Sequence, residues 1–223
     1  MGVAVALWAV AICLTGFWAA SLYINYRQAT IPAPLPRAAF DGSPPFSKDQ
    51  IRNLLRRVPQ TPAALREFMR HIGKVRVLDP ACGSGNFLYV ALKELLDLSK
   101  EVAVLAHELR LPSIPLEAGP HQLFGLEVNE YAHELAQIVV WIGYIQWLHE
   151  NGYSNDRSPI LGPQRTIEQR DAILGSNDSG EPSESAWPDA DIIIGNPPFL
   201  GGKRLRAELG DEYVNRLFDR YGG

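Results

Sequence analysis

Three acids and one amide each follow a short apolar run in this chain of 223 residues. They are Asp79, Glu127, Asp171 and Asn196. In parallel α/β sheets, ligands bind where the carboxyl ends of the strands meet. If each apolar run is a strand of one sheet, the four side chains lie at one edge. Carboxylates there can bind cations, hydroxyls or amines, and an amide oxygen can accept a hydrogen bond from an amine.

A glycine-rich loop follows the first of these acids, in the segment VLDPACGSGNF over residues 77–87. Gly83 and Gly85 let the backbone turn sharply and approach a ligand closely. The dinucleotide-binding pattern fails because Leu88 stands at the third glycine position, and no Gly-Lys-Ser/Thr follows for a phosphate loop. Asp79 disfavours a phosphate and favours a cation, so S-adenosylmethionine fits, with its positive sulfonium and amino groups. A glycine-rich turn capped by the aspartate is the structural alternative.

Two further acids extend this prediction toward a nucleoside. Glu127, in GLEVN, can accept hydrogen bonds from both ribose hydroxyls. Asp171, in RDAIL, can accept the hydrogens of an adenine amine. Either acid alone is more typical of a loop cap than of a ligand contact, but three acids beside a glycine loop predict a nucleoside site.

The segments DPACGSGNF, LEVN, RDAI and GNPPF, in this order, resemble the motif set of adenine-N6 DNA methyltransferases. Over roughly residues 60 to 223 the chain is similar to large single-chain type II restriction–methylation enzymes. The resemblance implies a class I methyltransferase-like (Rossmann-like) α/β fold with a mostly parallel sheet, S-adenosylmethionine as cofactor, and double-stranded DNA as partner. It implies cofactor binding by Asp79, Pro80, Ala81, Gly83, Gly85, Asn86, Phe87, Glu127, Val128, Asp171 and Ala172.

The same resemblance assigns catalysis to Asn196, Pro197, Pro198 and Phe199. The Asn196 side-chain carbonyl and the Pro197 backbone carbonyl can accept the two hydrogens of an adenine amine. This would aim the lone pair of the nitrogen at the methyl group, and the prolines would keep both acceptors rigid. Phe199 can stack on an adenine flipped out of the duplex. A plain proline-stiffened turn is the alternative, as is an N-methyltransferase of RNA or of protein glutamine, which usually has Tyr in place of Phe199.

Hydrophobic patterning predicts the elements that position these residues. Apolar periodicity and cap residues predict helices over residues 48–73, 85–98, 129–150 and 210–221, and strands over residues 74–79, 121–128, 168–174 and 190–195. Strands alternating with helices predict a parallel sheet with helices on both faces. Residues 175–190 are predicted to be a polar surface loop.

The amino-acid composition adds little about the class of protein or its partners. The chain is 46% hydrophobic and 21% charged, with a net charge of −4, which suits a globular protein and gives no overall basic field for nucleic acid. Cys13 and Cys82 lie far apart, and the five histidines have no metal-ligand spacing, so we expect neither a disulfide framework nor a metal site.

The amino-terminal segment differs in character from the rest. Residues 2–24 carry no charge, which is typical of a transmembrane helix, and Arg27 and Arg37 follow it. The positive-inside rule would then leave the remainder in the cytoplasm, tethered to the inner face of the membrane. A buried helix of a larger assembly, or sequence foreign to the domain behind it, is the alternative. We divide the chain into a hydrophobic helix (1–28), a Pro-rich linker (29–47) and a partial methyltransferase core (48–223).

The chain also departs from the family pattern. Few residues follow the N-P-P-F motif, only four strands are found, and the family's downstream target-recognition region is missing. We therefore expect a truncated core whose fourth strand is an exposed edge, with poor stability and little activity alone. A non-catalytic, membrane-anchored remnant is the remaining alternative.

Overall fold

A four-stranded parallel sheet forms the centre of the computed structural model, which describes residues 55–56, 58–153, 166–176, 182–196 and 202–221. Its order is β3-β2-β1-β6, and β6 lies at one edge. The strands are β1 (Val77–Asp79), β2 (Leu123–Glu127), β3 (Ile167–Gln169) and β6 (Ile192–Ile193). The predicted α/β class and parallel pairing are confirmed, as is the edge position of the fourth strand within the described sheet.

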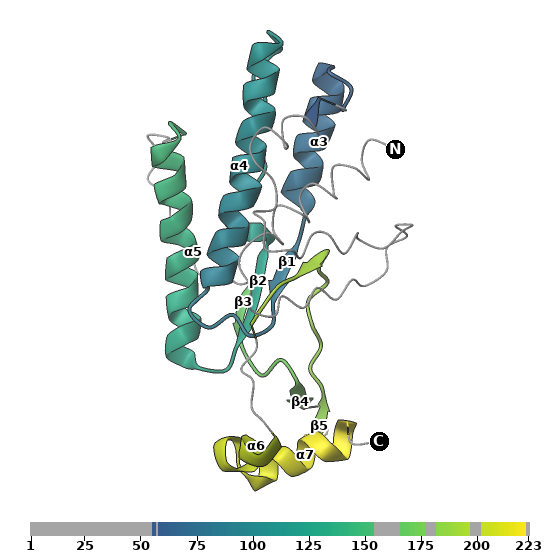
Figure 1. Ribbon diagram of the computed structural model, residues 1–223, viewed down its shortest axis with the longest axis vertical. Coiled ribbons are helices and arrows are strands. Elements are labelled where there is room, and N and C mark those ends of the chain that lie inside the picture. Colours follow the sequence, from purple (N-terminus) through teal and green to yellow (C-terminus); the bar gives the residue numbers. More distant parts are fainter. Residues whose placement is uncertain (1–54, 57, 154–165, 177–181, 197–201, 222–223) are drawn as a thin grey trace.

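Three long helices pack beside this sheet: α3 (Pro62–Lys74), α4 (Asn86–Glu108) and α5 (Glu130–Glu150) (Figure 1). The α4 helix connects β1 to β2, and α5 connects β2 to β3, so both crossovers run in the same direction across the sheet. Since such crossovers are right-handed, both helices lie on one face. The predicted covering of both faces is therefore not seen among the described connections.

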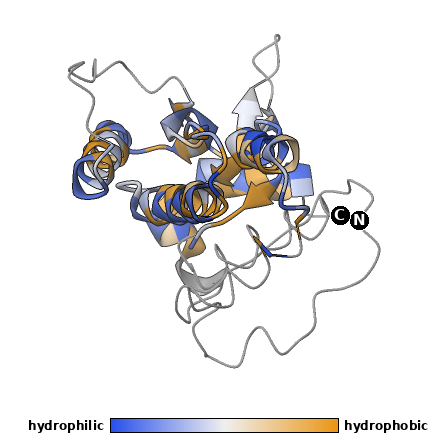
Figure 2. Ribbon diagram, turned by 90° about the horizontal axis from the view of Figure 1, so that it is seen from above, coloured by the Kyte–Doolittle hydropathy of each residue, from blue (hydrophilic) through white to orange (hydrophobic). Residues whose placement is uncertain are grey.

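The core lies between these helices and the sheet. Figure 2 shows the apolar colour on the central strands and on the helix surfaces next to them. In α4 the leucines at helical spacing, Leu88, Leu92 and Leu95, are almost fully buried. The helix continues to Glu108, past the predicted end at residue 98, because the following segment EVAVLAHE also consists of residues that favour helix.

The ends of α5 are those that the sequence predicts. The Asn129 side chain accepts a hydrogen bond from the backbone N–H of Ala132 at 2.9 Å, which caps the first turn. At the other end Asn151 is the C-cap, and Gly152 has a φ of 73°, a conformation that favours glycine.

The start of α3 is not where the sequence predicts it. The helix begins at Pro62, with Thr61 as N-cap, and residues 58–61 are not helical. Pro59 and Pro62 explain the difference, because proline disfavours helix at the preceding residue and is well tolerated in the first turn. Most of the remaining predicted helical segment, residues 48–54, lies outside the described residues.

A buried glutamine joins the starts of β1 and β2 at the edge opposite to their carboxyl ends. The Gln122 amide nitrogen donates to the backbone oxygens of Ile72 and Val75, at 2.6 and 2.8 Å. Its amide oxygen accepts from the N–H of Gly119 at 2.9 Å. The end of α3 and the entry into β2 are thus held together by one side chain, which has all its main hydrogen bonds satisfied while buried.

The carboxyl-terminal part adds a hairpin and two helices: β4 (Leu174–Ser176), antiparallel to β5 (Pro182–Glu184), then α6 (Gly202–Leu209) and α7 (Asp211–Tyr221). In Figure 1 they lie at the end of the molecule away from α3 and α4. The third predicted strand, over 168–174, is confirmed only at its start, in β3, because the chain leaves the sheet after Gln169 and residue 174 begins β4. The predicted loop over 175–190 contains the end of β4 and all of β5, so that prediction is wrong for these residues, whereas the last helix is confirmed. The residues of β5 are polar and show no apolar pattern from which a strand could be predicted. This strand is stabilised by long-range contacts instead.

The predicted hydrophobic helix and Pro-rich linker lie outside the described residues. Among the residues that the structure does describe, no helix has the length and apolar character needed to span a bilayer.

Candidate functional site

The loop between β1 and α4 joins two of the predicted acids. Asp79 ends β1, and its Oδ1 atom accepts a hydrogen bond from the N–H of Ala81 at 3.0 Å. The N–H of Gly83, further along the loop, donates to Glu127 Oε2 at the end of β2, at 2.8 Å. Because the loop bonds to both carboxylates, it brings the carboxyl ends of the two neighbouring strands together.

The two glycines of this loop are needed for different reasons. Gly83 has a φ of 53°, and a Cβ atom there would meet nothing within 4 Å. Gly85 has a φ of 82°, and its Cβ would lie 2.9 Å from the Cα of Ala136 in α5. Gly83 is therefore required by its backbone conformation and leaves open space beside the loop, whereas Gly85 also permits the close packing of α4 on α5.

Asp79 is a buried acid with an unused acceptor. Its Oδ2 atom has no hydrogen-bond partner among the described residues. Burial raises the pKa of Asp79 to about 7, with a smaller increase from the nearby Glu127 carboxylate, while the Ala81 N–H lowers the pKa. A cationic or hydrogen-bonding group placed beside Oδ2 would satisfy this oxygen and favour the ionised form.

Glu127 keeps acceptor capacity at the end of β2. Its Oε1 atom accepts from the N–H of Asn129 at 2.9 Å, and its Oε2 atom accepts from Gly83. A carboxylate offers about four acceptor positions, so about one on each oxygen remains for two hydroxyl groups. The next side chain, Val128, is 63% exposed and is available to pack against a planar ring.

The other loop residues named by the sequence have different exposures. Pro80 and Ala81 are half-buried in the turn, and Asn86 is exposed at the first position of α4. Phe87 is half-buried and packs against the hydrophobic core, so its ring already has apolar partners within the protein.

Asp171 lies near the same edge of the sheet, in the loop between β3 and β4. The loop begins beside β2, because the N–H of Arg170 donates to the Glu127 backbone oxygen at 2.9 Å. Asp171 Oδ1 accepts from the N–H groups of Ile173 and Leu174, at 2.7 and 3.1 Å. Its Oδ2 atom accepts from the hydroxyl of Tyr213 in α7 at 2.8 Å. Asp171 thus caps its own loop, as its sequence context allows, and also bonds to a distant helix.

The backbone of Ala172 is held as well. Its carbonyl oxygen accepts from the indole N–H of Trp187 at 2.6 Å. Sequence reasoning missed both Tyr213 and Trp187, because neither lies in a motif and each reaches the loop through tertiary packing. No local pattern in the sequence indicates these contacts.

The chain that leaves β6 passes directly beside Asp79. Ile194 donates its N–H to the Leu78 oxygen at 2.8 Å. The next residue, Gly195, is buried, and a Cβ atom there would lie only 2.9 Å from Asp79 Oδ1. Asn196 follows immediately and is exposed. The three predicted acids and the amide therefore lie at or near one edge of the sheet. Pro197, Pro198 and Phe199 lie outside the described residues.

Comparison with sequence models of known protein families shows which family this chain belongs to. The sequence model of the family described as "MmeI, DNA-methyltransferase domain" matches residues 55–221. The chain belongs to this family.

Relatives of this MmeI-type domain include DNA methyltransferase A of Bacillus subtilis (strain 168), 32% identical over 151 residues. That match covers 65% of this chain and 17% of the relative. A proposed type II restriction enzyme and methyltransferase of Methanocaldococcus jannaschii is 34% identical over 99 residues, covering 44% of this chain and 8% of the relative. The chain thus spans less than a fifth of the length of these two relatives.

Among solved structures, the type IIL restriction-modification enzyme MmeI in complex with DNA is 25% identical, with a TM-score of 0.39. The match covers 51% of this chain and 18% of that one. The family match and the two curated relatives confirm the predicted resemblance to the DNA methyltransferase part of restriction–methylation enzymes.

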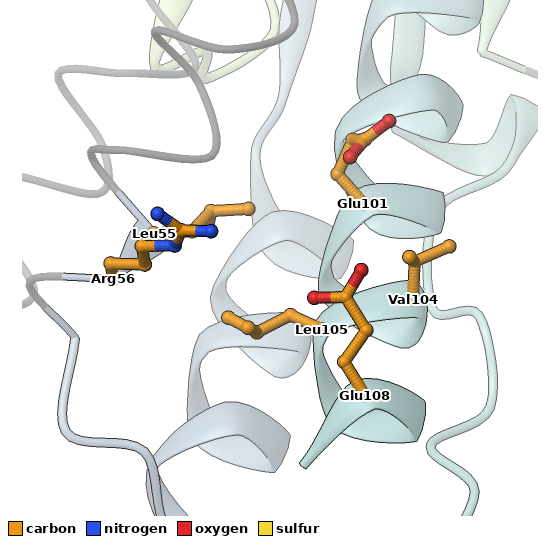
Figure 3. A pocket seen from close by; sticks show the side chains of 6 residues that line it. All are labelled: Leu55, Arg56, Glu101, Val104, Leu105 and Glu108. Atoms are coloured by element: carbon orange, nitrogen blue, oxygen red, sulfur yellow. The ribbon is translucent and has the colours of Figure 1, made fainter.

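Two hollows of this MmeI-type domain lie away from the carboxyl ends of the strands. A cavity of about 10 Å³ is lined by Leu55 and Arg56 on one side and by α4 on the other (Figure 3). A wider hollow of about 340 Å³ lies between residues 116–121 and the side chains of Trp141 and Tyr144. Neither is lined by a predicted site residue. Within the described part of the chain, no group of three or more His, Cys, Asp or Glu residues is placed to hold a metal ion.

Proposed function

We propose that this chain is the methyltransferase core of a restriction–modification-type enzyme that transfers a methyl group from S-adenosylmethionine to the N6 amine of an adenine in DNA. One observation carries the proposal. Gly195 packs on Asp79 so closely that no side chain fits between them. The residue that would hold the amine, Asn196, is therefore next to the loop that would hold the methyl donor.

The residues at the edge of the sheet fit S-adenosylmethionine. When bound, this cofactor supplies an electrophilic methyl group on a positively charged sulfur. The Oδ2 atom of Asp79, which has no partner among the described residues, would face a positive group. The two acceptor positions that the described residues leave open on Glu127 would bind the ribose hydroxyls. Val128 and Ile173 are exposed apolar side chains, 63% and 47%, that would contact the adenine ring of the cofactor.

The target amine would be held by the N-P-P-F segment. An adenine amine is a weak nucleophile because its lone pair is delocalised into the ring. The Asn196 side-chain oxygen and the Pro197 backbone oxygen would accept its two hydrogens and turn the lone pair toward the donor methyl. Phe199 would stack on the base, which must leave the duplex to reach the site.

A methyl-transfer assay tests this function. The full chain, in excess over duplex DNA, is incubated with S-adenosylmethionine labelled in the methyl group, so that even a single slow turnover is detected. We expect label in N6-methyladenine after digestion to nucleosides. Parallel reactions with RNA and with a glutamine-containing peptide separate the alternative substrates. Label in either of these but not in DNA, or no binding of donor at all, would overturn the proposal.

The Asn196→Ala variant tests the assigned catalytic role. We expect methyl transfer to fall by at least about a hundredfold, because one of the two acceptors is lost from the transition state. Binding of S-adenosylhomocysteine, measured by calorimetry, should change less than about twofold. Gln146→Ala is the matched control, since it removes an exposed amide from the outer surface of α5. If Asn196→Ala abolished cofactor binding as well, the role given to Asn196 would be wrong.

A further inference from the structure

We propose that Tyr213 is a positioning residue that fixes the Asp171 carboxylate for recognition of the cofactor's adenine amine. The inference rests on the proposed function, and it adds a helix that follows the N-P-P-F motif to the donor site. No sequence motif contains Tyr213. It is assigned by its hydrogen bond of 2.8 Å to Asp171 Oδ2.

The acceptor positions of Asp171 are almost filled. A carboxylate has about four such positions. The N–H groups of Ile173 and Leu174 occupy those of Oδ1, and the Tyr213 hydroxyl occupies one of Oδ2. With respect to the residues that the structure describes, one position on Oδ2 remains. Because three donors fix the plane of the carboxylate, this last position has a defined direction, as a specific amine contact requires.

The helix that carries Tyr213 is anchored to the same loop and hairpin. Tyr221, two turns further along α7, donates its hydroxyl to the Ile173 backbone oxygen at 3.0 Å. Val214 of α7 is fully buried, and Arg220 lies 3.7 Å from Glu184 of β5. Figure 1 shows α7 directly beside β5. The hydroxyl of Tyr213 is thus held in place by its helix.

The Tyr213 hydroxyl also stays available as a hydrogen-bond donor. Its partial burial and its hydrogen bond to the Asp171 carboxylate raise its pKa to about 12. The hydroxyl therefore keeps its proton across the physiological range. With the Asp171 carboxylate held in one orientation, an adenine, which carries an amine at position 6, is favoured over a purine with an oxygen there, since two acceptor oxygens facing each other repel.

The test compares two probes on two variants of the full chain. The probes are S-adenosylhomocysteine and its 6-oxo (inosine) analogue, and their dissociation constants are measured by calorimetry. We expect Tyr213→Phe to weaken the adenosine probe about fivefold, the effect of one hydrogen bond, and to leave the weaker binding of the inosine probe unchanged. Tyr221→Phe is the matched control, because it removes a hydroxyl bond from the same helix to the same loop but not to Asp171. Since Val214 and Arg220 still anchor α7, we expect less than a twofold change.

A second variant separates positioning from general damage. In an Asp171→Asn background, Tyr213→Phe should have no additional effect on the adenosine probe. Thermal unfolding followed by circular dichroism reports whether each variant folds. Two results for Tyr213→Phe would overturn the inference while leaving the proposed function intact. One is equal weakening of the binding of both probes, and the other is unchanged binding of the adenosine probe. Failure of the unmodified chain to bind S-adenosylhomocysteine would overturn both.

Discussion

At the scale of single residues, Asp79 is a carboxylic acid in an environment very different from water, because it is fully buried. One of its oxygens accepts a hydrogen bond from the loop, and the other is buried with no hydrogen-bond partner in the described part of the chain. A buried carboxylate is costly unless its charge is compensated. In the free protein, burial raises the free energy of the charged form, and a positive ligand would lower it. We propose that Asp79 is placed for binding more than for stability.

The stability of the free protein should depend on pH through Asp79. Its pKa is about 7 in the folded chain and 3.8 ordinarily, so folding favours the protonated acid. The resulting stabilisation is complete below pH 3.8 and is lost as the pH rises through about 7. Between pH 5 and pH 8 we expect a loss of about 3 kcal/mol in the free energy of unfolding.

Urea unfolding of the full chain and of Asp79→Asn across this range measures that loss. The variant has no ionisable group at this position, so the loss assigned to Asp79 should disappear from its curve, while contributions from other residues remain in both. Parallel curves for the two proteins would show that Asp79 is already ionised or that other groups dominate.

At the scale of elements, the junction between the glycine loop and α4 depends on how closely two helices pack. Gly83 and Gly85 share a positive φ, but only the Cβ of an alanine at 85 would meet the backbone of Ala136. Alanine at either position would strain the backbone, but only alanine at position 85 would also overlap with α5. Comparing the two variants therefore separates the two effects.

We expect Gly83→Ala to reduce the free energy of unfolding by about 1 kcal/mol, the cost of a left-handed conformation in a residue with a side chain. Gly85→Ala should cost about 2–4 kcal/mol, because overpacking against α5 adds to the same strain. Chemical unfolding of both variants measures the difference. Equal losses would mean that α4 and α5 move apart easily at this point.

The sequence predicts elements well where the information is local. Asn129 and Gly152 mark the ends of α5, and the leucines of α4 mark its buried face, because caps and periodicity act within a few residues. The β4–β5 hairpin and the long extension of α4 were missed, since the first depends on distant contacts and the second lacks a stop signal.

The candidate site divides in the same way. Asp79, Glu127 and the two glycines could be placed from the sequence because a strand, a tight turn and a helix determine their positions. Asp171 was expected at the end of a strand but lies in the loop beyond β3, and its bond to Tyr213 joins residues 42 positions apart. No single-sequence pattern reports such a pair.

At the scale of the whole molecule, stability should be distributed unevenly. The β2 strand has a neighbour on each side, whereas the described β6 pairs through two residues with β1 alone. The hairpin and α7 pack on each other at some distance from the main core. Opening of these outer parts exposes little apolar surface and should be easier than opening of the centre.

Hydrogen exchange followed by mass spectrometry tests this distribution on the full chain. We expect the slowest exchange in β2 and in the middle of α4, and faster exchange in β6, the hairpin and α7. Addition of S-adenosylhomocysteine should slow exchange around residues 79–85, 127–129 and 171–174. A ligand effect confined to other segments would contradict the assigned site.

The buried amide of Gln122 has a consequence for how this chain can vary. It ties the start of β2 to the peptide groups just before β1, so the offset between the two strands is set at their amino ends, while Asp79 and Glu127 stand at the opposite ends. Successive side chains alternate between faces of a sheet. Insertion or deletion of one residue inside either strand would therefore turn one acid away from the other, however well the loops adapted. Changes of length should be tolerated only in the connections, such as the segment between α4 and Gly119.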